Sequence, residues 1–166
     1  MYTRRTSPRA EGFDYANSGV YYVTVRTHEG RFLLGDIEDG VMKLSPFGRV
    51  VERLWNALPT HFTCVTLDAF VVMPNHLHGV LYLEDGLNPI TPHSLSAVIG
   101  ALKSFSSREI NQMRETPGGD VWQRSFYDHI VRNGADLERV RTYIHANPGN
   151  WPWDRHNPDR IVRPSS

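Results

Sequence analysis

Residues 64–83 read CVTLDAFVVMPNHLHGVLYL, and this stretch decides how the chain folds. Two apolar runs, 64–73 and 76–83, are rich in the β-branched and aromatic residues that favour strands. Pro74-Asn75 stands between them, and a proline interrupts regular pairing. We therefore predict two adjacent central strands separated by a short break.

The flanking sequence supplies the rest of a sheet and its helices. Further strands are expected at residues 19–27 and 121–131, with a small hairpin made of 32–34 and 41–44 around Asp39-Gly40. Three helices are expected after the capping residues Ser45, Ser94 and Asp136, and they end near Pro59, Pro117 and Pro148. This order favours an α+β fold, a ferredoxin-like antiparallel sheet with helices on one face.

The length and composition are those of one soluble domain. A chain of 166 residues with 40% hydrophobic residues is long enough for one core and short for two. We expect a single domain over residues 1–166, with flexible tails at 1–11 and 159–166. No apolar run approaches the roughly 18 residues of a membrane helix, so we expect a cytoplasmic protein that does not contact membranes.

The charge balance does not by itself indicate a nucleic-acid partner. The 18 basic and 18 acidic residues cancel, so no overall field attracts a polyanion. Sixteen of the 18 basic residues are nevertheless Arg, whose planar fork suits phosphate. The candidate phosphate contacts are Arg4, Arg5, Lys103, Arg124 and Arg132; an ordinary solvated face is the alternative interpretation.

The sharpest local feature is the His76-Leu77-His78 triplet within the second predicted central strand. Side chains at positions i and i+2 of a strand project from one face, about 6–7 Å apart. Both imidazoles can therefore converge on one divalent ion while Leu77 enters the opposite layer. As an isolated pattern, two histidines on a strand are more often surface or core residues than ligands.

The second feature is Tyr143 and Asn147 near the end of the last predicted helix. Residues four apart share a helix face, so the phenol and the amide can face one partner. A tyrosine with an ordinary pKa near 10 needs a metal or a base to act as a nucleophile. Tyr127 is a rival nucleophile and His129 a rival ligand, and periodicity does not choose between the two sets.

Together these motifs resemble the REP-associated tyrosine transposases, members of the one-tyrosine, His-hydrophobic-His (HUH) family of single-strand DNA transposases. The resemblance covers roughly residues 12 to 158, and the order and spacing of its motifs make it specific. Its main motifs are GVYYVT (19–24), FVVMPNHLHG (70–79), WQR (122–124), DHIVR (128–132) and YIHANP (143–148).

The resemblance implies a site and a reaction. It assigns His76 and His78 as metal ligands, Asn147 as a third ligand and Tyr143 as the nucleophile. The implied cofactor is Mg²⁺ or Mn²⁺, and the implied partner is single-stranded or hairpin DNA, so the resemblance also implies association with the nucleoid. The implied reaction links the tyrosine to a 5′ phosphate and releases a 3′ hydroxyl, with possible strand rejoining by a monomer or homodimer.

Two alternatives remain open at this point. One is a DNA- or RNA-binding module of the same fold without catalysis, and the other is an unrelated metal hydrolase. Because two imidazoles and one amide carry no negative charge, we also expect an ion there to bind weakly until a DNA phosphate joins it.

Overall fold

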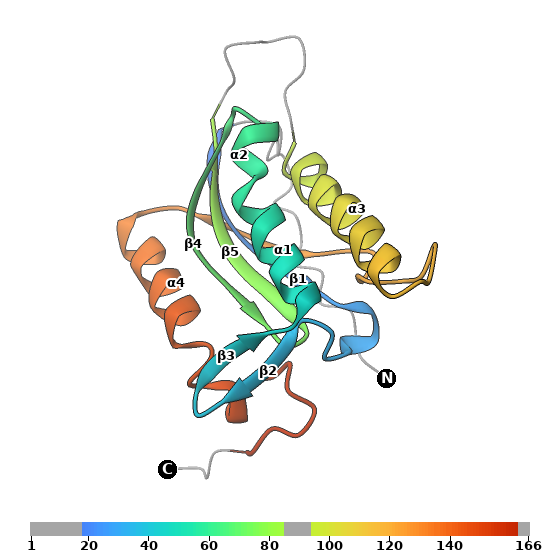
Figure 1. The fold of residues 1–166 in the computed structure, drawn as a ribbon. Helices are drawn as coiled ribbons and strands as arrows, with labels where there is room; N and C mark the ends of the chain where they lie inside the picture. Colours follow the sequence, from blue (N-terminus) through green and yellow to red (C-terminus); the bar gives the residue numbers. More distant parts are fainter. Residues whose placement is uncertain (1–17, 85–93, 163–166) are drawn as a thin grey trace.

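A four-stranded antiparallel sheet lies at the centre of the computed structural model, which describes residues 18–84 and 94–162 (Figure 1). The strand order is β4-β5-β1-β6. The bounds of these strands are β1 Gly19–Arg26, β4 Val65–Met73, β5 His76–Leu83 and β6 Tyr127–Val131. Every neighbouring pair is antiparallel. This order, with one helical crossover before β4 and one before β6, is the ferredoxin-like topology, so the α+β class is confirmed.

The first helical layer covers one face of the sheet and buries the larger core. It consists of α1 (Pro46–Asn56), the short α2 (Leu58–His61) and α3 (Leu95–Met113). Ser45 and Ser94 cap α1 and α3 as expected, each accepting a hydrogen bond from the backbone N–H three residues later. Leu77 and Leu81 of β5 point into this core, where both are fully buried.

The last helix, α4 (Gly134–Ala146), packs against the opposite face (Figure 1). The sequence predicts helices on one face of the sheet. This holds for α1, α2 and α3, whereas α4 lies on the other face. The physical reason is that the second face of β1 and β5 also carries apolar side chains, so a second layer is needed to bury Tyr22 and Val80. Val140 and Ile144 of α4 complete this smaller core.

The cap of α4 also differs from the expectation. Asn133 is the N-cap, and its side chain accepts from the N–H of Asp136. Asp136 lies in the first turn and binds His129 and Arg139 instead. An acidic side chain is favourable in a first turn because of the unpaired N–H groups there.

Two predicted strands have different bounds in the structure. The hairpin pairs β2 (Gly35–Glu38) with β3 (Val41–Leu44), because Asp39 and Gly40 both have positive φ and form a two-residue turn. Its first strand therefore lies after the predicted 32–34. The last strand is regular only from Tyr127, since Lys103 Nζ binds the carbonyl groups of residues 123–125.

Two short 3-10 helices complete the described elements, η1 (His28–Gly30) and η2 (Trp151–Trp153). Within the predicted C-terminal tail, Ile161 donates its N–H to the carbonyl of Pro152, 2.7 Å away. The predicted tail at 1–11 and residues 163–166 lie outside the described part. None of the described helices is both long and apolar enough to span a membrane.

A contact between β5 and α1 explains Gly79. A methyl group at Gly79 would lie 2.3 Å from Cζ2 of Trp55, which is fully buried. Gly79→Ala should therefore lower the free energy of unfolding by about 1–3 kcal/mol through overpacking. Gly100→Ala is the control, because nothing lies within 4 Å of the added methyl in α3, and it should raise stability by roughly 0.5–1 kcal/mol. Urea unfolding of both variants tests this; equal effects would contradict the packing argument.

An ion pair attaches α4 to β4. Arg141 Nε and Nη2 donate to the two carboxylate oxygens of Asp68, at 2.8 and 2.6 Å, and the Tyr82 hydroxyl donates to the same carboxylate. The Arg141 hydrogen bond is the main cause that lowers the pKa of Asp68 to about 2, against the opposing effect of burial. The ionised form of Asp68 is therefore the one that stabilises the fold.

Asp68→Asn should lower the free energy of unfolding by about 1–2 kcal/mol at neutral pH. The pKa of Asp68 in the folded protein lies below the unfolded value of about 3.9. The difference in free energy of unfolding between Asp68→Asn and wild type should therefore be fully present at pH values above about 3.9. It should shrink as the pH falls through about 2. Glu138→Gln is the control, since exposed Glu138 pairs with the same arginine. A pH-independent difference in urea unfolding would refute this role for Asp68.

Candidate active site

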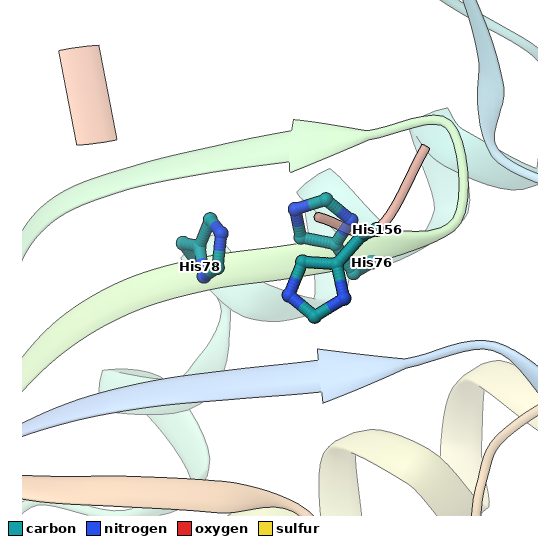
Figure 2. Close-up of side chains that lie close together, drawn as sticks. All are labelled: His76, His78 and His156. Carbon is teal, nitrogen blue, oxygen red and sulfur yellow. The ribbon is translucent and has the colours of Figure 1, made fainter. Parts of the chain in front are cut away.

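His76 and His78 lie side by side on β5 (Figure 2), on the face that α4 covers. Their ring centroids are 4.4 Å apart, and both side chains are fully buried. Val80, two residues further along the strand, packs in the core under α4. The alternation of β5 therefore places the two imidazoles together on one face, as the sequence predicts.

Hydrogen bonds orient the His76 ring. The amide nitrogen of Asn75 donates to two carbonyl groups, those of Gly30 and His156. The Asn75 oxygen therefore faces His76 Nδ1 at 2.8 Å and must accept a hydrogen from it. In the neutral ring this leaves the lone pair on Nε2, and that buried atom has no hydrogen-bond partner among the described residues.

His78 is oriented from β1. The hydroxyl groups of Tyr22 and Thr24 each lie 2.8 Å from His78 Nδ1. Its Nε2 is buried and, like that of His76, has no partner in the described part of the chain. Metal-binding histidines commonly show this arrangement, with one ring nitrogen held by a neighbour and the other directed at the ion.

A third imidazole, that of His156, completes the cluster from the C-terminal segment after η2 (Figure 2). Its ring centroid lies 4.5 Å from that of His76 and 6.0 Å from that of His78. One ligand atom from each of the three rings lies within 4.8 Å of the others. Sequence reasoning missed His156, because no local spacing relates residue 156 to residue 76.

Burial keeps all three imidazoles neutral. Loss of solvent lowers the pKa of His76 and His78 well below the usual value, and the neighbouring histidines lower it further. Burial is also the main cause that lowers the pKa of His156 to about 3, followed by the charges of Arg26 and Arg155. A neutral imidazole is the form that binds a metal ion.

Tyr143 of α4 lies beside this cluster. Its ring centroid is 5.4 Å from that of His78, and the residue is 42% exposed, so the ring packs against His78 and is still accessible. Burial and the Asp154 carboxylate raise the pKa of Tyr143. The phenol therefore needs a nearby cation or base to ionise.

Asn147, one turn after Tyr143, is the C-cap of α4 and is buried. The Asn147 side chain opposes the effect of burial on two neighbours, since it raises the pKa of His76 and lowers that of Tyr143, so it lies near both. Its amide nitrogen donates to the backbone carbonyl of Tyr143, 3.4 Å away. Asn147 Oδ1 is a further buried atom without a partner among the described residues. The observed set of unpartnered nitrogen and oxygen atoms fits a divalent cation.

The rival residues from β6 have other neighbours. Tyr127 packs edge-on against Tyr22, with ring centroids 6.2 Å apart. His129 Nε2 lies 2.9 Å from a carboxylate oxygen of Asp136. His129 is thus occupied at the start of α4 and is not part of the three-imidazole cluster.

The candidate phosphate contacts are dispersed. Lys103 lies on α3, across the sheet from His76, where its ammonium donates to backbone carbonyl groups. Burial lowers the pKa of Lys103 to about 8. Arg124 and Arg132 are exposed at the two ends of the β6 region, whereas Arg4 and Arg5 lie outside the described residues.

Comparisons with known proteins support the resemblance. A Haemophilus influenzae protein of uncharacterized function is 29% identical over 165 residues, covering 91% of this chain and 92% of that protein. The REP-associated tyrosine transposase of Escherichia coli K12 is 30% identical over 91 residues, covering 52% of this chain and 46% of its own length.

A solved structure of a REP-associated tyrosine transposase bound to a REP hairpin has the same fold. Its TM-score is 0.58 at 18% identity, with coverage of 93% of this chain and 77% of that one. The family described as IS200-like transposases matches residues 50–147, which contain the histidine pair, Tyr143 and Asn147. Since that match spans more than half of the sequence, the chain belongs to the IS200-like transposase family.

Proposed function

We propose that this chain is a metal-dependent endonuclease that cleaves hairpin DNA of palindromic repeats in its single-stranded parts through a 5′-phosphotyrosine intermediate. One observation carries the proposal. The accessible phenol of Tyr143 lies against His78, where two imidazole nitrogens are buried with no partner among the described residues. A nucleophile and a cation site are thus adjacent.

The substrate class is supported by the relatives. The solved structure of similar fold is of a protein bound to a REP hairpin, and the family is one of transposases. Exposed Arg124 and Arg132 can contact the phosphate backbone of such DNA. Arg4 and Arg5 are further candidates for these contacts.

The ion belongs between β5 and α4. His76 Nε2, His78 Nε2 and Asn147 Oδ1 would hold it, and Mg²⁺ or Mn²⁺ suits a reaction at phosphate. When bound, the ion supplies Lewis-acid polarisation of the scissile phosphate and a positive charge beside the phenol. The protein contributes the orientation of both imidazoles through Asn75, Tyr22 and Thr24.

Tyr143 carries the covalent step. Its Oη forms a bond to phosphorus while the bond from phosphorus to the 3′ oxygen breaks. The phenolic proton passes to solvent and the leaving 3′ oxygen takes up a proton, so the products are a 5′-phosphotyrosine and a free 3′ hydroxyl. Because the tyrosyl ester preserves the bond type, attack by a 3′ hydroxyl can reverse the step and rejoin strands.

Tyr143→Phe should abolish the covalent protein–DNA adduct, because it removes only the attacking oxygen. Tyr127→Phe is the matched control and should still form the adduct, since Tyr127 packs against Tyr22 rather than against His78. The measurement is a denaturing gel of each variant with a labelled single-stranded hairpin and Mn²⁺, with a gel shift for binding. An adduct from Tyr143→Phe but not from Tyr127→Phe would reassign the nucleophile, and adducts from both would mean that neither tyrosine is the nucleophile. Hairpin binding by wild type without any adduct would favour a binding module.

His76→Ala and His78→Ala should each reduce cleavage at least about 100-fold, because each removes a ligand nitrogen. Hairpin binding should change little, since phosphate contacts supply most of the affinity. His145→Ala is the control, because His145 is exposed on the same helix as Tyr143. Rates at saturating DNA and gel-shift affinities separate the two effects, and full cleavage by either buried-histidine variant would rule out the proposed ligands.

A further inference from the structure

The structure assigns His156 as a metal ligand, so that the DNA-free protein holds a divalent transition-metal ion, in preference to Mg²⁺, in a three-imidazole site. The inference rests on the proposed function for the identity of the site, and it adds the ligand and the metal class. It also revises the expectation that an ion binds weakly before DNA arrives.

The first support is convergence. One ligand atom from each of His76, His78 and His156 lies within 4.8 Å of the other two. Two nitrogens that share an ion at about 2.1 Å each are at most about 4.2 Å apart. The 4.8 Å limit exceeds this distance by about 0.6 Å, so the three atoms lie close to the spacing that one shared ion requires.

The second support is a set of unpartnered atoms. His156 Nδ1 is buried without a partner in the described part of the chain, as are His76 Nε2, His78 Nε2 and Asn147 Oδ1. Leaving one such atom unsatisfied costs about 1–3 kcal/mol. A cation held by the three imidazoles would satisfy one nitrogen of each ring. By contrast, His129 on the same sheet face uses its ring nitrogen in a bond to Asp136.

The third support is that His156 is held in place independently of an ion. Its carbonyl accepts from Asn75 Nδ2 at 2.8 Å, and its N–H donates to Asp154 Oδ1 at 2.7 Å. Asn75 also accepts from His76 Nδ1, so one side chain positions two of the three rings. A site that is assembled before the ion arrives loses less entropy on binding.

Arg155 opposes the ion in the metal-free state. Its Nε donates to His156 Nε2 at 3.4 Å, a long contact between adjacent residues. That contact favours the ring proton on Nδ1, so ligation through Nδ1 requires the proton to move to Nε2 and the guanidinium to turn away. Removal of the arginine should therefore strengthen metal binding.

The donor set determines the metal class. Among the residues that the structure describes, the cluster contains three imidazoles and no carboxylate. Mg²⁺ prefers carboxylate and water oxygens, whereas imidazole suits the later transition metals. Mn²⁺ is intermediate between Mg²⁺ and the later transition metals in its preference for oxygen or nitrogen ligands. Co²⁺ is a suitable probe because its visible absorption depends on its coordination.

The test is a titration of the DNA-free full chain with Co²⁺, followed by visible absorption and calorimetry, with Mg²⁺ as competitor. Wild type should bind one Co²⁺ that a tenfold excess of Mg²⁺ does not displace. His156→Gln should weaken binding at least about tenfold, His129→Gln should not, and Arg155→Gln should tighten it. Thermal melting of each metal-free variant establishes that it is folded.

His156→Gly with added imidazole provides a second measurement. If His156 is a ligand, free imidazole should restore Co²⁺ absorption to this variant, which a purely structural role would not allow. The assignment of His156 is overturned if His156→Gln binds Co²⁺ with wild-type affinity, or if imidazole does not restore the absorption of His156→Gly. The metal preference is overturned if equimolar Mg²⁺ displaces Co²⁺ from the wild-type protein. These results do not depend on DNA cleavage. If the protein forms the DNA adduct but its Co²⁺ binding does not depend on His156, only the inference about His156 is rejected. If Co²⁺ binding depends on His156 but no adduct forms, only the proposed function is rejected.

Discussion

The alternation of side chains along β5 is the constraint on which the rest of the structure depends. Leu77 and Leu81 enter the core under α1 and α3, while His76, His78 and Val80 face α4. A shift of one residue in the pairing with β1 would exchange the two sets. Register is therefore strongly specified, because such a shift would bury imidazoles among aliphatic side chains and expose leucines to the site.

Burial of three neutral imidazoles makes the site dependent on the groups behind it. Asn75, Tyr22 and Thr24 bind one nitrogen each of His76 or His78 and leave the other directed toward the cluster. These partners come from β1 and from the turn that joins β4 to β5. The orientation of the rings is thus as rigid as the sheet itself, which suits a site that must hold an ion near a reactive phosphate.

Tyr143 comes from a different layer, and its placement depends on how α4 is attached. Val140 and Ile144 pack on the sheet, and Arg141 reaches Asp68 on β4. An apolar contact and an ion pair on the same helix restrict both sliding and rotation. The phenol is consequently held beside His78, although the two residues are far apart in the sequence.

The sequence by itself determined the periodic features of this protein: the strands of the sheet, most helix ends and the pairing of His76 with His78 and of Tyr143 with Asn147 on common faces. These follow from spacings of two and four residues, which act locally. The tertiary structure alone decided that α4 covers the second face, and that His129 is occupied while His156 joins the cluster. The physical reason is that contacts between distant segments are settled by which buried surfaces and polar groups must be satisfied together, and no local spacing encodes that.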